Sequence, residues 1–142
     1  MVFIIVLFII LIDRITKVKA KNILQNCRIE IFSGKIQFFL VRNNGAFMNI
    51  LSNNRRLLLF SSIMGIILMI AYFVLYEVDN YNVVVKVGYS FFIGGGIANT
   101  IDRIKDGYVT DFIYFNIKRF PVFNIADFFI FGGFILILIQ SI

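Results

Sequence analysis

The chain contains no histidine and only one cysteine in 142 residues. Without histidine, a Ser-His or Cys-His nucleophile pair and any zinc site with a histidine ligand are excluded. Cys27 cannot form a disulfide within the chain, and no general base can be assigned to it. We therefore interpret it as a small apolar residue in a strand. Among the remaining catalytic groups, carboxylates are the best supplied.

Charged residues are also scarce. They make up 15% of the chain, against 60% hydrophobic residues, whereas a soluble domain is about a quarter charged and about half apolar. This composition predicts an integral membrane protein with a single domain, residues 1–142, and room for four spans of about 20 residues each. We interpret the net charge of +6 as complementary to membrane lipid and expect no nucleic acid partner, because no nucleic-acid motif accompanies it.

Four apolar stretches are candidates for membrane-spanning helices with antiparallel neighbours. They are Met1–Ile12, Leu57–Tyr76, Val83–Ile101 and Asn124–Ile142. Twelve apolar residues are too few to cross about 30 Å of hydrocarbon. Either the first helix continues past Asp13 or the N-terminus of the protein lies upstream. The expected fold class is a membrane all-α protein with a small β element.

The β element is predicted between the first two spans. Residues Cys27–Phe32 and Lys35–Val41 alternate between apolar and polar side chains, and Ser33-Gly34 separates the two runs. This pattern is typical of a β-hairpin. We expect it on the extracytoplasmic membrane surface, because its apolar side chains need burial somewhere: Ile29, Ile31, Ile36 and Phe38.

Two aspartates, Asp111 and Asp127, stand beside hydrocarbon-rich sequence on either side of one loop. An ionised carboxylate is unfavourable at that depth unless other groups stabilise it, so such acids are functional candidates. Two of them in contact share a proton, the state that activates water for peptide hydrolysis. The alternative is that one or both face water at the interface.

A glycine run, Gly94–Gly96, interrupts the third span, and we interpret it as a helix-packing site. Asn99, Asp102 and Arg103 follow at helical spacing and share one face of the helix. A polar face next to the loop that contains Asp111 is typical of the wall of a site.

Polar and small residues form five blocks in order along the chain: Asp13–Lys17, Asn43–Ala46, Gly94–Arg103, Gly107–Phe112 and Phe123–Asp127. These blocks resemble those of lipoprotein signal peptidase (signal peptidase II), the integral-membrane aspartyl protease family of bacteria, and the resemblance covers nearly the whole chain. Thr110 stands where the family pattern Gly-x-Val-Val-Asp-Phe has valine, Ala98 replaces a glycine, and Phe47 and Met48 also depart from the pattern.

The resemblance implies an endopeptidase that removes signal peptides from diacylglyceryl-modified prolipoproteins, cleaving just before the lipidated cysteine without metal or cofactor. Asp111 and Asp127 would be the catalytic pair, and Asp102 a positioning residue. We assign Asp111 as the more often protonated partner, because the dipole of the fourth helix favours the Asp127 anion. The implied substrate-binding residues are Asn43, Gly45, Asn99, Arg103 and Asn124, and the implied supporting residues are Asp13, Lys17 and Asp102. We expect a monomer.

The family topology places both termini in the cytoplasm and the active site on the extracytoplasmic side of the bacterial cell membrane. Thirteen of the fourteen Lys and Arg residues lie outside Leu57–Ile101, and the positive-inside rule would place those basic segments in the cytoplasm instead. We expect the family topology, because charges used inside a folded site do not orient the chain as a free loop does.

Other interpretations remain open from the residues alone. A four-span transporter or channel subunit could use Asp102, Asp111 and Asp127 as an ion path. A Ser-Lys peptidase would need a close pair, and only Ser33 and Lys35 offer one, in a predicted turn. Three aromatic residues could contact substrate acyl chains or simply pack in the protein: Phe112, Phe115 and Phe123.

Overall fold

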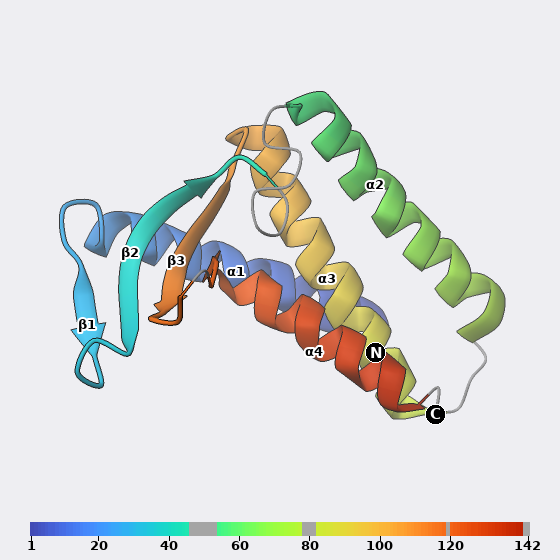
Figure 1. The fold of residues 1–142 in the computed structure, drawn as a ribbon. Helices are drawn as coiled ribbons and strands as arrows, with labels where there is room; N and C mark the ends of the chain where they lie inside the picture. Colours follow the sequence, from blue (N-terminus) through green and yellow to red (C-terminus); the bar gives the residue numbers. More distant parts are fainter. Residues whose placement is uncertain (46–53, 78–81, 119, 141–142) are drawn as a thin grey trace.

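The protein is described by a computed structural model that covers residues 1–45, 54–77, 82–118 and 120–140. Three of the four α-helices, α1, α2 and α4, pack around the central α3, and a small sheet lies at one end (Figure 1). The helices are α1 (Val2–Ile23), α2 (Arg55–Tyr72), α3 (Val83–Lys105) and α4 (Ile125–Gln140), and a π-helical turn (Phe73–Glu77) follows α2. The strands are β1 (Ile29–Ile31), β2 (Ile36–Asn43), β3 (Val109–Phe115) and β4 (Val122–Phe123).

Helix α1 continues past Asp13 to Ile23, as the first of the two alternatives predicted. Among the described residues, two helices are long and apolar enough to cross a membrane, Arg55–Tyr76 and Val83–Lys105. Helix α4 is apolar but has only 16 residues. In α1, the apolar first half is followed by a charged half that packs against α3 and the sheet.

The predicted hairpin is confirmed: β1 and β2 pair antiparallel, with Ile31 opposite Ile36. The placement of Cys27 in a strand is wrong, because β1 begins at Ile29 and Cys27 is exposed before it. Its turn contains Gly34 at φ +80°, a conformation that favours glycine. Strands β3 and β4 extend the sheet in the order β1-β2-β3-β4, and the register between β2 and β3 shifts between Phe38 and Val41.

One face of the sheet packs on the end of α1. Ala20 of α1 and Leu24, the residue that caps its C-terminus, form a buried cluster with Phe112 of β3, and Phe38 and Leu40 of β2 pack against it. The outer strand β1 keeps Ile29 and Ile31 exposed. The sheet is therefore fixed to the helices through β2 and β3.

Helices α3 and α4 approach closely at glycines, which confirms the helix-packing interpretation of Gly94–Gly96. A Cβ atom on Gly95 would lie 2.5 Å from the carbonyl oxygen of Ala126, and one on Gly94 would lie 3.1 Å from Ile9. The backbone of α4 thus lies against α3 at the turn that begins with Ala126 and Asp127.

This contact predicts that Gly95→Ala destabilises the protein by about 1–3 kcal/mol, because the new methyl group meets backbone that cannot move alone. Gly132→Ala is the matched control, since its Cβ would meet only Phe91 at 3.7 Å. Thermal unfolding in detergent measures both. Equal melting temperatures for the two variants would contradict the close packing of α3 on α4.

Candidate active site

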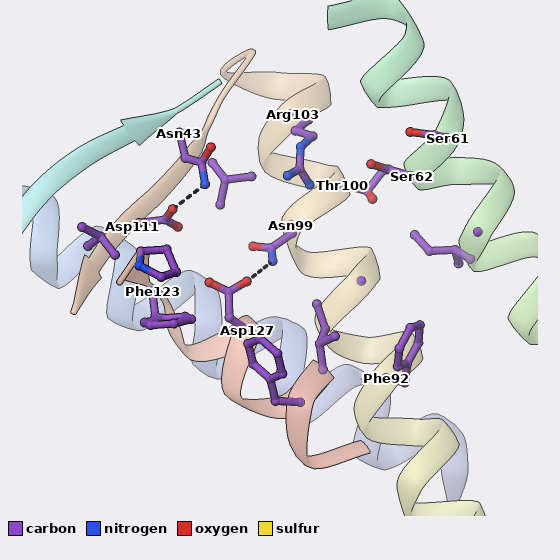
Figure 2. A pocket seen from close by; sticks show the side chains of 18 residues that line it. Asn43, Ser61, Ser62, Phe92, Asn99, Thr100, Arg103, Asp111, Phe123 and Asp127 are labelled. Atoms are coloured by element: carbon purple, nitrogen blue, oxygen red, sulfur yellow. Dashed lines mark hydrogen bonds between the residues drawn. The ribbon is translucent and has the colours of Figure 1, made fainter. Parts of the chain in front are cut away.

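Asp111 and Asp127 line the same cavity, which has a volume of about 390 Å³ (Figure 2). Asp111 lies on β3 and Asp127 in the first turn of α4. The cavity walls come from α2, α3, the β3–β4 segment and α4. Its apolar lining includes Ile66, Phe92, Phe123, Ile130 and Phe131. Two carboxylates therefore face one partly apolar cavity.

Both oxygens of Asp111 accept hydrogen bonds from side-chain amides. Asn43 Nδ2 donates to Oδ2 at 2.8 Å, and Asn124 Nδ2 donates to Oδ1 at 2.6 Å. Asn43 lies on β2 opposite Val109, so strand alternation places its side chain on the same face of the sheet as Asp111. These two donors fix the orientation of a carboxylate that is 2% exposed.

Asp127 and Asn124 form a reciprocal cap at the start of α4. The Asn124 backbone N–H donates to Asp127 Oδ2 at 3.0 Å, and the Asp127 backbone N–H donates to Asn124 Oδ1 at 3.0 Å. This is the pattern of a capping box, with asparagine and aspartate in the two positions. The other oxygen, Oδ1, accepts from Asn99 Nδ2 at 2.8 Å.

Asn124 thereby connects the two acids. Its fully buried side chain donates to Asp111 and also to Asn99 Oδ1 at 3.2 Å, while its backbone donates to Asp127. Asn124 thus helps to position both carboxylates.

A buried lysine supports this network from α1. Lys17 Nζ lies 2.7 Å from Asp13 Oδ2 and 2.9 Å from Asp102 Oδ2, and donates to Asn99 Oδ1 at 3.0 Å. Asp13 also accepts a hydrogen bond at 3.0 Å from the backbone N–H of Ala126, next to Asp127. Because an ammonium group has three N–H donors, three oxygens match it fully. Asp13, Lys17 and Asp102 thus support the acids without lining the cavity.

Asp102 faces Lys17 rather than the cavity, so its loss should weaken cleavage without ending it. We expect Asp102→Asn to lower activity by about tenfold and to reduce stability, because it removes one charge partner of a buried lysine. A cleavage assay together with thermal unfolding checks both effects. Complete inactivity in a well-folded Asp102→Asn protein would mean that Asp102 itself belongs to the catalytic pair.

Arg103 lines the cavity and contacts Gly45, which is not among the lining residues. Arg103 Nη2 donates to the Gly45 carbonyl oxygen at 2.9 Å, and Gly45 N–H donates to Asn43 Oδ1 at 3.0 Å. Arg103 Nε is buried and has no hydrogen-bond partner in the part of the chain that the structure describes, so this donor can bind another molecule. Of the departures from the family pattern, Phe47 and Met48 lie outside the described residues, as does Ala46 of the second block.

Three further polar residues line the cavity that sequence reasoning did not identify. Ser61 and Ser62 of α2 both donate to the Leu58 carbonyl of their own helix, and the Thr100 hydroxyl is buried without a partner. The only sequence feature that could have indicated them is a hydroxyl group within an apolar span, and this feature is too common to identify a site by itself. Figure 2 shows these side chains across the cavity from Asp111.

Burial sets the electrostatics of Asp111. Loss of hydration is the largest cause, and the negative charge of Asp127 adds to it; together they raise the pKa of Asp111 to about 7. The amide hydrogen bonds from Asn43 and Asn124 oppose this rise only in part. Asp111 therefore gains or loses a proton near neutral pH.

Other candidates from the sequence lie elsewhere. Ser33 and Lys35 are exposed in the hairpin turn, and neither lines the cavity. Among the aromatic candidates, Phe123 lines the cavity, Phe112 packs in the cluster under α1, and Phe115 contacts Phe123 edge-on.

Comparison with known proteins agrees with this architecture. A family profile described as Signal peptidase (SPase) II matches residues 5–142. A lipoprotein signal peptidase of Caldicellulosiruptor bescii is 37% identical over 134 residues, covering 94% of this chain and 85% of its own. One from Staphylococcus aureus is 37% identical over 138 residues, covering 95% of this chain and 83% of its own.

Solved structures agree as well. A structure described as a bacterial membrane enzyme superposes with a TM-score of 0.86 at 31% identity, and covers 99% of this chain and 92% of its own. A second such structure has a TM-score of 0.84, with 99% and 86% coverage at the same 31% identity. The fold, the order of the polar blocks and these relatives lead to one conclusion: the chain is a membrane protein that belongs to the signal peptidase II family.

Proposed function

We propose that this protein is an aspartyl endopeptidase that removes signal peptides from diacylglyceryl-modified prolipoproteins, with Asp111 and Asp127 as the catalytic pair. The observation that carries the proposal is the pair of carboxylates on one cavity, the buried Asp111 and the half-buried Asp127, joined through Asn124. The names of the curated relatives support the substrate class.

The pair can perform hydrolysis with one shared proton. The ionised carboxylate removes a proton from water, and the protonated one donates a hydrogen bond to the scissile carbonyl and stabilises the developing negative charge. Asp111 takes the protonated role, since its pKa is raised to about 7. Asp127 takes the ionised role, because it lies at the N-terminus of α4 and accepts hydrogen bonds from one side-chain N–H, of Asn99, and one backbone N–H, of Asn124. Arg103, whose charge interacts with both acids, binds the substrate backbone through its free Nε.

This assignment predicts the pH dependence of cleavage. The rate should fall as pH rises above about 7, by about tenfold per pH unit, because Asp111 loses the proton that it must donate. Measurement of kcat/KM against pH checks this. In Asp127→Asn, the pKa of Asp111 should fall, since one cause of its rise is removed; ¹³C NMR titration of the Asp111 carboxyl measures it. A rate that keeps rising to pH 9 would reverse the assignment.

The membrane placement follows from the same proposal. The protein is a monomer whose four helices all cross the bilayer of the bacterial cell membrane, with both termini in the cytoplasm. The sheet and the catalytic dyad, Asp111 and Asp127, lie at the extracytoplasmic surface. The apolar cavity wall formed by Ile66, Ile130 and Phe131 accepts apolar parts of the substrate, whereas the acyl chains remain in hydrocarbon. The exposed isoleucines of β1 contact lipid headgroups and the acyl region below them.

A cleavage assay with purified protein in detergent tests the activity. The substrate is a prolipoprotein with a diacylglyceryl-modified cysteine, and the control is the same chain without the lipid. We expect mass spectrometry to find cleavage just before the lipidated cysteine and none in the control. Absence of cleavage by a folded protein, or equal cleavage of both chains, would contradict the proposed substrate class.

A further inference from the structure

A second cavity of about 240 Å³ lies between the end of α1 and the sheet. Strand alternation separates it from the dyad: Arg42 and Thr110 are opposite each other in the β2–β3 register, and their side chains are on the other face from Asn43 and Asp111. Figure 1 shows α1 running across this face of the sheet. The lining residues are Lys21, Asn22, Gln25, Leu40, Val41, Arg42, Tyr108 and Thr110.

The charge of this lining is positive. Lys21 and Arg42 line the cavity, and among the described residues no carboxylate does. Both cations approach the ring of one residue, Tyr108, at 5.6 Å and 5.2 Å from its centroid. Asp106 pairs with Lys21 at 2.9 Å, which uses one of the three N–H donors of the Lys21 ammonium group. The other two donors of Lys21 and all donors of Arg42 have no described carboxylate partner. Two cations held near one ring repel each other unless an anion lies between them.

A buried hydroxyl points to the same ligand. Thr110 is 3% exposed, lines this cavity, and its Oγ1 has no hydrogen-bond partner among the described residues. Buried polar atoms are almost always satisfied, so an unpartnered hydroxyl in a polar cavity indicates a bound group. Thr110 is also a position where this chain departs from the valine of the family pattern, so the hydroxyl is a feature of this chain.

We propose that this cavity binds a phosphate group, with Arg42 and Lys21 as the charged donors and the Thr110 hydroxyl as a neutral donor. Guanidinium and ammonium groups beside hydroxyl and amide donors are the chemistry that phosphate oxygens accept. A volume of about 240 Å³ holds several times the roughly 30 Å³ of one water molecule. The site lies at the end of α1 beside the sheet, where an anionic phospholipid headgroup or a free phosphate can supply the group.

Lipid binding to the intact protein in detergent tests the proposal. Native mass spectrometry measures retention of phosphatidylglycerol and phosphatidylcholine, and a separate arm titrates inorganic phosphate by thermal shift. For the phosphate source that binds, we expect Arg42→Gln to weaken the binding by about tenfold or more and Thr110→Val to weaken it by about fivefold. Arg28→Gln, which removes an equal charge beside β1 and outside the cavity, should leave binding within about twofold.

The arms also distinguish the two sources. Selective retention of phosphatidylglycerol assigns the site to a headgroup, and stabilisation by inorganic phosphate alone assigns it to a free phosphate; both support the site if the variants weaken the effect. Equal binding in wild type, Arg42→Gln and Thr110→Val would overturn it, as would the absence of binding in both arms. Arg42 is exposed, so its variant should fold normally.

Discussion

Asp111→Asn and Asp127→Asn should each reduce cleavage by at least about 10³-fold, because an amide can neither take a proton from water nor supply the shared proton. Each substitution keeps the shape of the side chain, so the protein should still fold and bind the lipidated peptide. At position 111, one of the two amide donors, from Asn43 or Asn124, then faces an amide nitrogen instead of an oxygen. We expect this mismatch to lower stability by about 1–3 kcal/mol.

The measurement is single-turnover cleavage of a diacylglyceryl-modified peptide, with peptide binding and thermal unfolding measured on the same samples. Asp106→Asn is the matched control: it removes an exposed carboxylate at the end of α3 that pairs with Lys21, outside the dyad cavity. It should cleave at close to the wild-type rate. More than a tenth of wild-type activity in either dyad variant would exclude that residue as a member of the pair.

Lys17→Met should cause the largest loss of stability among single substitutions outside the dyad. Lys17 is 1% exposed, and its replacement leaves Asp13 buried without its cation and leaves Asp102 with only the more distant Arg14, at 3.8 Å. Removing one partner of a buried ion pair costs about 3–5 kcal/mol. Activity should also fall, because Asn99 loses the donor that holds its oxygen while its amide nitrogen holds Asp127.

Denaturant unfolding in detergent micelles measures this loss, with Lys19→Met as the control. Lys19 is on the same helix two residues away and is exposed, so its replacement should change stability by no more than about 0.5 kcal/mol. Lys17→Met/Asp102→Asn should lose less than the sum of the two single changes, since a neutral amide needs no counterion. Equal losses in Lys17→Met and Lys19→Met would show that the buried cluster contributes nothing.

Local sequence patterns predicted the elements better than their connections. The β1–β2 hairpin follows from alternation around Ser33-Gly34, and the glycine run in α3 predicted helix packing. The apolar stretch at the N-terminus stops where the charged residues of α1 begin, yet the helix continues to Ile23. It can do so because Lys17 contacts oxygen atoms on α3. That pairing joins residues 85 positions apart, and a single sequence contains no record of it.

The same limit applies to the site. The acids were recognisable because carboxylates beside apolar spans are unfavourable without partners, and the block order indicated Asn43, Asn99 and Arg103. The sequence did not identify Ser61, Ser62 and Thr100 as site residues, because serine and threonine in a helix commonly donate hydrogen bonds to the backbone of their own helix. Both serines do so here. Strand β4 and its pairing with β3 were also not predicted, because two residues give no alternation to recognise.

The shift in register between β2 and β3 determines which side chain stands beside Asp111. Phe38 pairs with Ile113 and Val41 with Asp111, so the two residues Phe39 and Leu40 stand against Phe112 alone, as in a β-bulge. If the pairing before this bulge continued unchanged, Arg42 instead of Asn43 would lie opposite Val109, on the face of the acids. A guanidinium beside Asp111 would lower the pKa of that carboxyl and remove the proton at neutral pH. One extra residue in a strand thus gives Asp111 a neutral neighbour on β2 and places Arg42 on the other face of the sheet.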